Sequence, residues 1–173
     1  MKRFACAIYL ALLFTPACLA ATLPPTAVAN NFYAWTMTVG GGIPSAKQLQ
    51  QTSGFFSVRL IDLLRTSLAA EERCVKATPP DLKPPIFEGS LFVDHYEGLT
   101  KVLSLKKARQ HGKVIITARL AYVEPRSPKN VYRWTDRLFL IMENGNWVID
   151  DIATKSSLSA ILKKYTSKEE CGI

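Results

Sequence analysis

The sequence lacks the short motifs that identify most enzyme classes and metal sites. It contains no Cys-x-x-Cys pair, and its only histidines are His95 and His111, so we expect no zinc site. The glycine run 40–42 is not followed by Lys-Ser or Lys-Thr, which excludes a P-loop there. A dinucleotide fingerprint and a Gly-x-Ser-x-Gly nucleophile motif are also missing. We therefore expect neither a metal ion nor a cofactor.

Long apolar runs are missing as well, apart from a short one at the N-terminus. Residues 4–14 are apolar and follow a basic Lys-Arg pair, and small residues precede a cleavage position at Ala20/Ala21. These are the three parts of a secretory signal. The run is shorter than the roughly 20 apolar residues that a transmembrane helix needs. We predict a signal peptide over 1–20, one mature domain over 21–173, and a periplasmic or secreted location.

Two other interpretations of the N-terminus stay open. The apolar run could form a core helix of the folded domain. Cys18 could be the lipid-modified residue of a lipoprotein, although residues 15–17 resemble a lipobox poorly because Pro16 does not suit an extended cleavage site. We expect cleavage after the signal rather than either alternative.

Cysteine is scarce, with four residues in the chain, and a cleaved signal would remove two of them. The remaining pair, Cys74 and Cys171, is a disulfide candidate in an oxidising compartment. Closing the long loop between them would raise the free energy of unfolding by roughly 4–5 kcal/mol in the chain-entropy model, if the bond does not strain the fold. The alternative is a buried thiol at Cys74 and a separate thiol near the C-terminus.

Acidic residues are outnumbered, with 14 Asp and Glu against 22 Lys and Arg, which gives a formal net charge of +8. Loss of Lys2 and Arg3 with the signal would lower that charge to about +6. Basic residues gather at 106–113 and at 163–164, and solvated faces explain both clusters better than a nucleic-acid stripe. We expect no nucleic-acid partner, whereas a basic exported domain could meet anionic envelope surfaces or acidic partners.

Apolar spacing predicts two helices in the first half of the mature chain. Residues 24–39 carry apolar side chains at helical spacing and are followed by the glycine run, which ends a helix. A second helix is predicted from about Thr52 to Val75, with Phe56 in its apolar stripe. The proline-rich segment 78–85 predicts an extended connector, and the mixed signals of 86–100 predict a loop with short turns.

The second half of the chain predicts an antiparallel meander and a short closing helix. Asn144-Gly145 between two apolar runs is a strong signal for a β-hairpin. The expected strands are about 101–109, 114–122, 131–142 and 147–152, and the expected helix is 156–165. Helices followed by a meander predict an α+β domain whose N-terminal helices pack on a curved four-stranded antiparallel sheet.

Three places in the chain carry a resemblance to a known family. They are NFYAW at 31–35, PIFEG at 85–89 with YEGLT at 96–100, and YRWTD at 132–136 leading to GNWVIDDI at 145–152. Together these segments resemble an exported bacterial domain-of-unknown-function family of the nuclear-transport-factor-two-like superfamily, which includes ketosteroid isomerase and scytalone dehydratase. The resemblance implies a cone-shaped fold. It does not imply one activity, because this fold serves both enzymes and binding modules.

The resemblance also implies a pocket inside the cone, where the enzymes of the superfamily use a carboxylate base that faces a hydrogen-bond donor. The candidates for acid–base chemistry are Asp136, Glu97 and His95. The candidate binding residues are Tyr33, Trp35, Glu88, Tyr96, Glu97, Tyr132, Trp134 and Asp136.

The position of Asp136 depends on the phase of its strand. In one phase Asp136 faces inward with Trp134 and Leu138, and desolvation would raise its pKa towards that of a general base. In the other phase Phe139 faces inward and Asp136 lies in solvent. A structural alternative is a cross-strand pair between Asp136 and Arg119 or another basic neighbour.

The remaining candidates have structural explanations too. Glu88 and Glu97 each precede a glycine that permits a tight turn, and each could cap a helix or satisfy loop amides. Asp150 and Asp151 could hold a loop or cap the last helix. The three tryptophans are most simply core residues.

Small size, export, a basic surface and the lack of a catalytic constellation predict a non-catalytic binding protein of the cell envelope, as a monomer or weak homodimer. Its partner would be another envelope protein or a small apolar ligand, and an immunity or inhibitor protein is a specific version. The alternative is a small-molecule isomerase or dehydratase with a carboxylate in the cone. A deep cavity around a buried carboxylate would favour the enzyme, and a filled interior with an exposed rim would favour the binder.

Overall fold

The structure is a computed structural model that describes residues 22–52 and 54–166. The predicted signal peptide, the lipidation alternative at Cys18 and the cysteine Cys171 lie outside the described residues. Cys74 lies in the last turns of the second long helix. Its pairing with Cys171 therefore stays a prediction, as do export and the boundaries of the mature domain.

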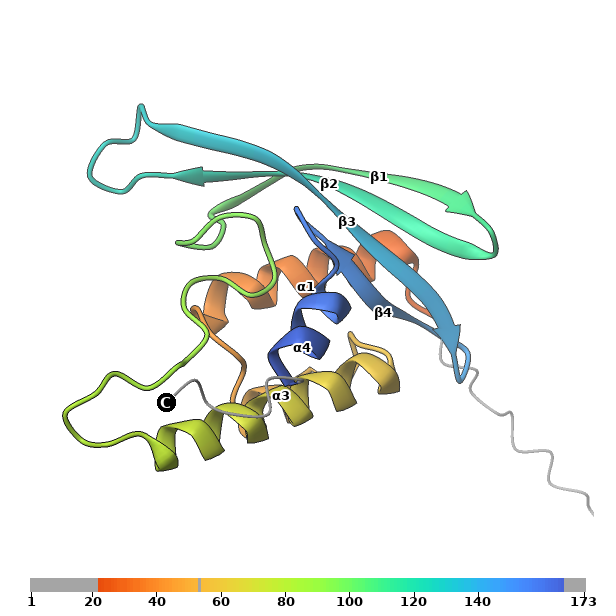
Figure 1. The fold of residues 1–173 in the computed structure, drawn as a ribbon. Helices are drawn as coiled ribbons and strands as arrows, with labels where there is room; N and C mark the ends of the chain where they lie inside the picture. The colour runs from red at the N-terminus through yellow and green to blue at the C-terminus, as the bar shows by residue number, and fades with distance from the viewer. Residues whose placement is uncertain (1–21, 53, 167–173) are drawn as a thin grey trace, which may run out of the picture.

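The described chain is an α+β fold with helices and a single open antiparallel sheet (Figure 1). The sheet has four strands in the order β1-β2-β3-β4, so each strand pairs with its neighbour in sequence. The helices are α1 (Pro25–Val39), α2 (Ala46–Gln51), α3 (Val58–Ala77) and α4 (Leu158–Thr166). The strands are β1 (Lys101–Gln110), β2 (Lys113–Val123), β3 (Val131–Glu143) and β4 (Asn146–Ala153). The predicted meander and its closing helix are thus confirmed.

The predicted second helix is wrong at its start, because the chain leaves helical geometry between α2 and α3. Phe56 forms a parallel bridge with Ile149 of β4, and the Ile149 backbone N–H donates to the carbonyl of Phe55 at 2.7 Å. The helix begins instead after Ser57, whose hydroxyl accepts the N–H of Leu60 at 3.1 Å. The prediction followed the apolar spacing and overlooked this cap signal.

Helix α2 was not predicted, although the sequence carries a signal for it. The Ser45 hydroxyl accepts the N–H of Gln48, and the Gln48 side chain accepts the N–H of Ser45, which makes a capping box. This short helix lies before the predicted second helix, whose expected first residues 52 and 54–57 are not helical.

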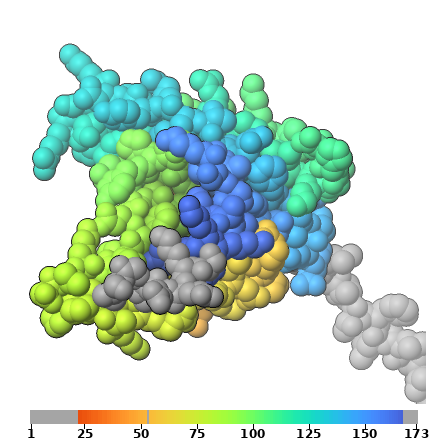
Figure 2. Space-filling model, viewed as in Figure 1, coloured from red at the N-terminus to blue at the C-terminus, as the bar shows by residue number. Residues whose placement is uncertain are grey.

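The strand phase of β2 and β3 places one face of the sheet against the helices. Alternate residues of β2 from Val114 to Leu120 are buried, as are Asp136, Leu138 and Leu140 of β3. In Figure 1 the helices lie on this one side of the sheet, with α1 beneath it and α3 farther away, and no described element covers the opposite side. The space-filling view from the same direction shows the β1–β3 layer along the top of the molecule (Figure 2).

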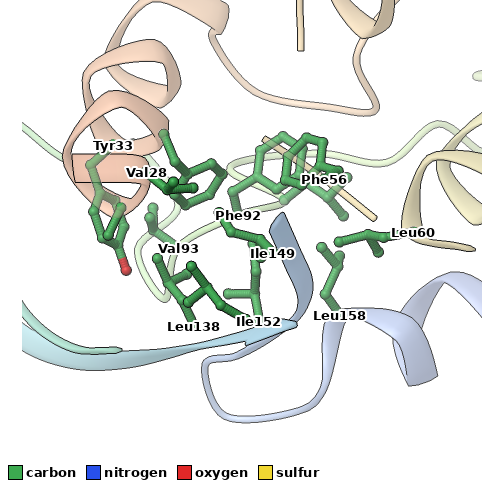
Figure 3. Close-up of a cluster of buried hydrophobic side chains, with 14 of the residues drawn as sticks. Val28, Tyr33, Phe56, Leu60, Phe92, Val93, Leu138, Ile149, Ile152 and Leu158 are labelled. Atoms are coloured by element: carbon green, nitrogen blue, oxygen red, sulfur yellow. The ribbon is translucent and has the colours of Figure 1, made fainter. Parts of the chain in front are cut away.

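The core lies between the sheet and the helices and is rich in aromatic rings. The ring of Phe92, from the loop before β1, lies 5.9 Å from Phe32 and 5.7 Å from Phe56, measured between ring centroids. Figure 3 shows Phe56 and Phe92 close to Ile149 of β4, with Leu138 and Ile152 nearby. The loop 86–100 therefore supplies core residues even though it contains no helix or strand. Within the described ranges, no helix is both long enough and apolar enough to cross a membrane.

Candidate functional site

Asp136 is buried in the interior of the domain, on the helix-facing side of β3. The exposed fraction of its side chain is 0%. Its Oδ2 accepts a hydrogen bond from Nε1 of Trp134 at 3.1 Å, whereas Oδ1 has no partner among the described residues. A buried carboxylate oxygen without a hydrogen-bond donor is unusual, because burial removes its contact with water.

The surroundings of Asp136 favour its neutral form. Burial raises the pKa of this carboxyl from its ordinary value to about 7, and the charge of Asp94 adds to that effect. The hydrogen bond from Trp134 and the backbone of Asp94 act in the opposite direction and keep the pKa from rising further. A carboxyl with such a pKa exchanges its proton near neutral pH, which is the property of a general base or acid.

Tyr33 of α1 is the second buried polar group beside this carboxyl. Its hydroxyl is buried and has no hydrogen-bond partner among the described residues. Burial, and then the negative charge of Asp136, raise the pKa of Tyr33 well above its ordinary range. The hydroxyl therefore keeps its proton, and it lies near enough to Asp136 for the carboxylate charge to act on it, although no hydrogen bond joins the two groups.

His95 connects this pair to a group of aromatic rings near the surface. Its ring stacks on Tyr122 at 4.6 Å and on Trp134 at 5.4 Å, and it lies 5.3 Å from Tyr132. The Nδ1 atom of His95 is buried and has no partner among the described residues. We call these residues the carboxylate–aromatic cluster: Tyr33, His95, Tyr122, Tyr132, Trp134 and Asp136. Five of the six are among the site or acid–base candidates predicted from the sequence.

The proposed cross-strand pair between Asp136 and Arg119 is wrong. In the register of β2 and β3, Asp136 lies opposite Ala118, and Arg119 lies opposite Thr135 on the other face of the sheet. The partner of Asp136 is the indole of Trp134, two residues away on the same strand. Strand phase explains this outcome, since residues of odd and even number point to opposite faces.

A second candidate site lies at the surface, where the loop 86–100 meets the turn after α1. Two hollows of about 370 and 510 Å³ open there, and both are lined by Gly41, Gly89 and Tyr96. Tyr96 is 64% exposed between them. The first hollow also contains Met37 and Glu97, and the second also contains Ile86, Glu88 and Lys83. We call this surface the Tyr96 rim.

Glycines allow the close packing that shapes the Tyr96 rim. Gly89 has φ +76°, and a Cβ there would lie 2.5 Å from the Tyr96 ring, which leaves no room for a side chain. A Cβ at Gly41 would lie 2.8 Å from the carbonyl oxygen of Gly89, and that oxygen accepts the N–H of Gly42 at 2.7 Å. The three consecutive glycines and the two Glu-Gly pairs are visible in the sequence as places where the chain can turn. That the two segments contact each other is a long-range feature, which the sequence did not reveal.

The other predicted site residues divide between the rim and structural roles. Glu88 forms an ion pair with Lys83 at the rim, and Glu97 lines the first hollow. Trp35 belongs to neither site, since its ring packs at 5.3 Å from Phe92 in the core. Met37 and Ile86 at the rim were not predicted as site residues, and they are 45% and 43% exposed although apolar.

Asp150 and Asp151 have the structural roles that the sequence favoured. The Asp151 carboxylate accepts hydrogen bonds from the Ser157 hydroxyl at 2.6 Å and from the Ser159 N–H at 3.0 Å, at the start of α4. Asp150 pairs with Arg59 at 2.9 Å and with Lys113 at 3.6 Å. Although burial opposes it, hydrogen bonds from Arg59 and Ser57 keep the pKa of Asp150 below its ordinary value.

The four hollows described on the molecule do not reach the buried pair. Asp136 and Tyr33 line none of these four. In the described part of the chain, no group of three His, Cys, Asp or Glu residues could hold a metal ion. Comparison with protein-family models and with curated proteins finds no match for this chain.

Proposed function

We propose that the protein is an exported, non-catalytic binding protein whose partner contacts the Tyr96 rim. The observation that carries this proposal is the exposure of Tyr96 between two hollows, with the apolar side chains of Met37 and Ile86 on either side. Tyrosine is one of the residues on which binding energy concentrates at protein interfaces. Its large amphipathic ring contributes much contact area for little loss of conformational entropy.

The chemistry of the rim favours a protein partner. Apolar side chains lie beside Glu97 and beside the ion pair of Lys83 with Glu88, so a small apolar centre has a charged border. This resembles the anatomy of protein interfaces, in which a core of aromatic and apolar groups is surrounded by polar residues. The glycine contacts beneath Tyr96 also fix the two loops against each other, which reduces the ordering needed on binding.

The burial of Asp136 supports a non-catalytic role. Catalysis by Asp136 would require substrate to reach its carboxyl, yet the side chain is fully buried and lines none of the four hollows described above.

The partner that we propose is another envelope protein, and an immunity or inhibitor protein against an exported toxin is the specific version. Secretion of the chain with removal of residues 1–20, a Cys74–Cys171 disulfide and a monomeric or weakly dimeric state belong to this proposal. So does membership of the nuclear-transport-factor-two-like superfamily, for which helices on one face of a meander sheet are the supporting observation.

Site-specific photocrosslinking in the producing cell tests the proposed function. A benzoylphenylalanine placed at position 96 should give one dominant protein adduct. The control is the same group at position 142, because Met142 is 50% exposed near the C-terminal end of β3, beside the β3–β4 turn and outside the Tyr96 rim. The proposal requires the adduct at 96 and its absence at 142. Equal adducts at both positions, or none at 96, would contradict it.

The carboxylate–aromatic cluster favours a second candidate function, a small-molecule isomerase or dehydratase. Asp136 has a pKa near neutrality, and the Tyr33 hydroxyl is a donor beside it, so the pair has the components for moving a proton at an enolisable carbon. Access would require the loop 86–100, which carries His95, to move away from β3. Turnover of an enolisable steroid or hydroxy-ketone that Asp136→Asn abolishes would establish this function in place of the first.

A further inference from the structure

The outward face of the sheet carries a group of cations that the proposed binding site does not use. Residues opposite one another in the register share a face, and burial identifies the face of Val114, Ile116 and Leu138 as inward. The exposed basic residues on the other face that form no ion pair, here named the outer cations, are Lys101, Lys106, Arg119, Arg133 and Arg137, whereas Lys113 on the same face pairs with Asp150.

The outer cations form a compact array on three adjacent strands. Lys106, Thr117 and Arg137 lie in one row across β1, β2 and β3, and the next rows contain Arg119 opposite Thr135 and Arg133 opposite Ala121. Neighbouring strands are about 4.8 Å apart, so these charges repel one another at short range. Such an array is stabilised when an anionic surface covers it.

None of the outer cations has an acidic partner within the described ranges. Every ion pair found there involves other residues. The nearest carboxylate by register is Asp151, opposite Phe139, and its oxygens already accept hydrogen bonds from the start of α4. The guanidinium of Arg137 lies 5.8 Å from the ring of Phe139, which holds it over the sheet.

We propose that this outward face docks onto an anionic phospholipid bilayer. The face is broad, its cations are separated by Ser, Thr and Ala, and its apolar residues Ile115 and Phe139 are half-buried, so it has no exposed aromatic anchor. Protein interfaces have an apolar core, whereas arginine and lysine side chains bind phosphate oxygens, so the composition fits a layer of phosphate head groups better than a protein partner. A second copy of the chain would bring like charges together.

This orientation is compatible with the binding site already described. The loop 86–100 lies on the helix side of the sheet, away from the outer cations (Figure 1). A protein held to a membrane by its outward face would therefore present the Tyr96 rim to a partner. The inference does not depend on the identity of that partner.

Vesicle binding by matched variants tests the proposal. The test variant combines Lys106→Gln with Arg137→Gln. The control variant combines Lys107→Gln with Arg109→Gln, which removes the same amount of charge from the other face of β1, near its hairpin end. Each cation near an anionic surface changes the partition coefficient about fivefold, so the first variant should bind phosphatidylglycerol vesicles about 25-fold more weakly. The control should change by less than about threefold, and high salt should abolish binding.

Three outcomes would overturn the proposal. Equal losses in both variants would assign any binding to net charge instead of this face. Equal binding to phosphatidylcholine and phosphatidylglycerol vesicles would show that head-group charge does not drive the binding. Binding through the N-terminal segment, which all variants share, would give this result. Retention of the wild type on immobilised polyglutamate without binding to anionic vesicles would assign the face to an acidic protein.

Discussion

The carboxyl group of Asp136 is buried at a free-energy cost that the described contacts do not offset. One oxygen has an indole donor and the other has none. Its folded-state pKa of about 7 lies above the ordinary value of 3.8, so the folded protein binds one more proton than the unfolded chain between these values. The free energy of unfolding should therefore fall as the pH rises from about 4 to about 7.

Replacing Asp136 with Asn should remove this pH dependence. The amide keeps the shape and can accept the Trp134 hydrogen bond, but it does not ionise. Relative to wild type, the variant should gain on the order of 4 kcal/mol of unfolding free energy between pH 4 and pH 8. Urea unfolding at several pH values measures this difference. Parallel curves for the two proteins would mean that Asp136 ionises as an exposed carboxyl does.

Tyr33 is a second buried polar residue whose substitution gives an independent prediction. Its hydroxyl is buried without a partner, so Tyr33→Phe should change the unfolding free energy by less than about 1 kcal/mol, or increase it. Tyr33→Ala is the control and should lower stability by about 3–5 kcal/mol, because it empties a core position. Thermal and urea melts compare the two variants. A large loss in Tyr33→Phe would reveal a bound water or ligand that uses the hydroxyl.

At the scale of elements, the junction of α3 with β4 determines how the helices are attached to the sheet. The Ser57 hydroxyl accepts the N–H of Leu60 and donates to Asp150 at 3.0 Å, while the Ser57 N–H donates to the carbonyl of Ile149 at 2.9 Å. Arg59 then pairs with Asp150. Helix start and strand are therefore joined by one polar network.

Ser57→Ala should lower the free energy of unfolding by about 1–2 kcal/mol, through loss of the helix cap and of a donor to Asp150. Ser45→Ala is a matched control, because Ser45 caps the short and exposed α2 and should cost less. Denaturant melts of both variants measure the difference. Equal small losses would show that the Ser57 network contributes no more than an ordinary cap.

The sequence predicted the meander because its strands alternate and its hairpin turn has a strong local signal. It predicted α1 for a similar reason, namely apolar spacing ended by glycines. It placed the start of α3 wrongly because Phe56 has helical spacing to Leu60 but pairs with β4, which is a long-range contact. Local patterns do not report such contacts.

The candidate sites, too, were predictable only where they depend on local patterns. Strand alternation left two phases for Asp136, and only packing against α1 distinguishes them. The contact of Gly41 with Gly89 joins two loops that are distant in sequence, so no local pattern reveals the Tyr96 rim. The residues were recognisable as candidates, whereas their grouping required the fold.

At the scale of the whole molecule, three regions have separate roles. The interior stabilises the fold and buries Asp136, whereas we propose that the Tyr96 rim contacts a protein and that the outer cations face a membrane. The two candidate functions compete directly, because an enzyme would act through Asp136 and a binder through Tyr96. A substitution at each residue therefore separates them.

The most direct measurement is the dissociation constant of the partner identified by crosslinking at position 96, determined for wild type, Tyr96→Ala, Asp136→Asn and Met142→Ala. Removing a central interface tyrosine costs at least about 2 kcal/mol of binding free energy. We therefore expect Tyr96→Ala to raise the dissociation constant about 30-fold or more. Asp136→Asn and Met142→Ala should each stay within about threefold of wild type. Unchanged affinity in Tyr96→Ala, with binding or turnover lost in Asp136→Asn, would contradict the account.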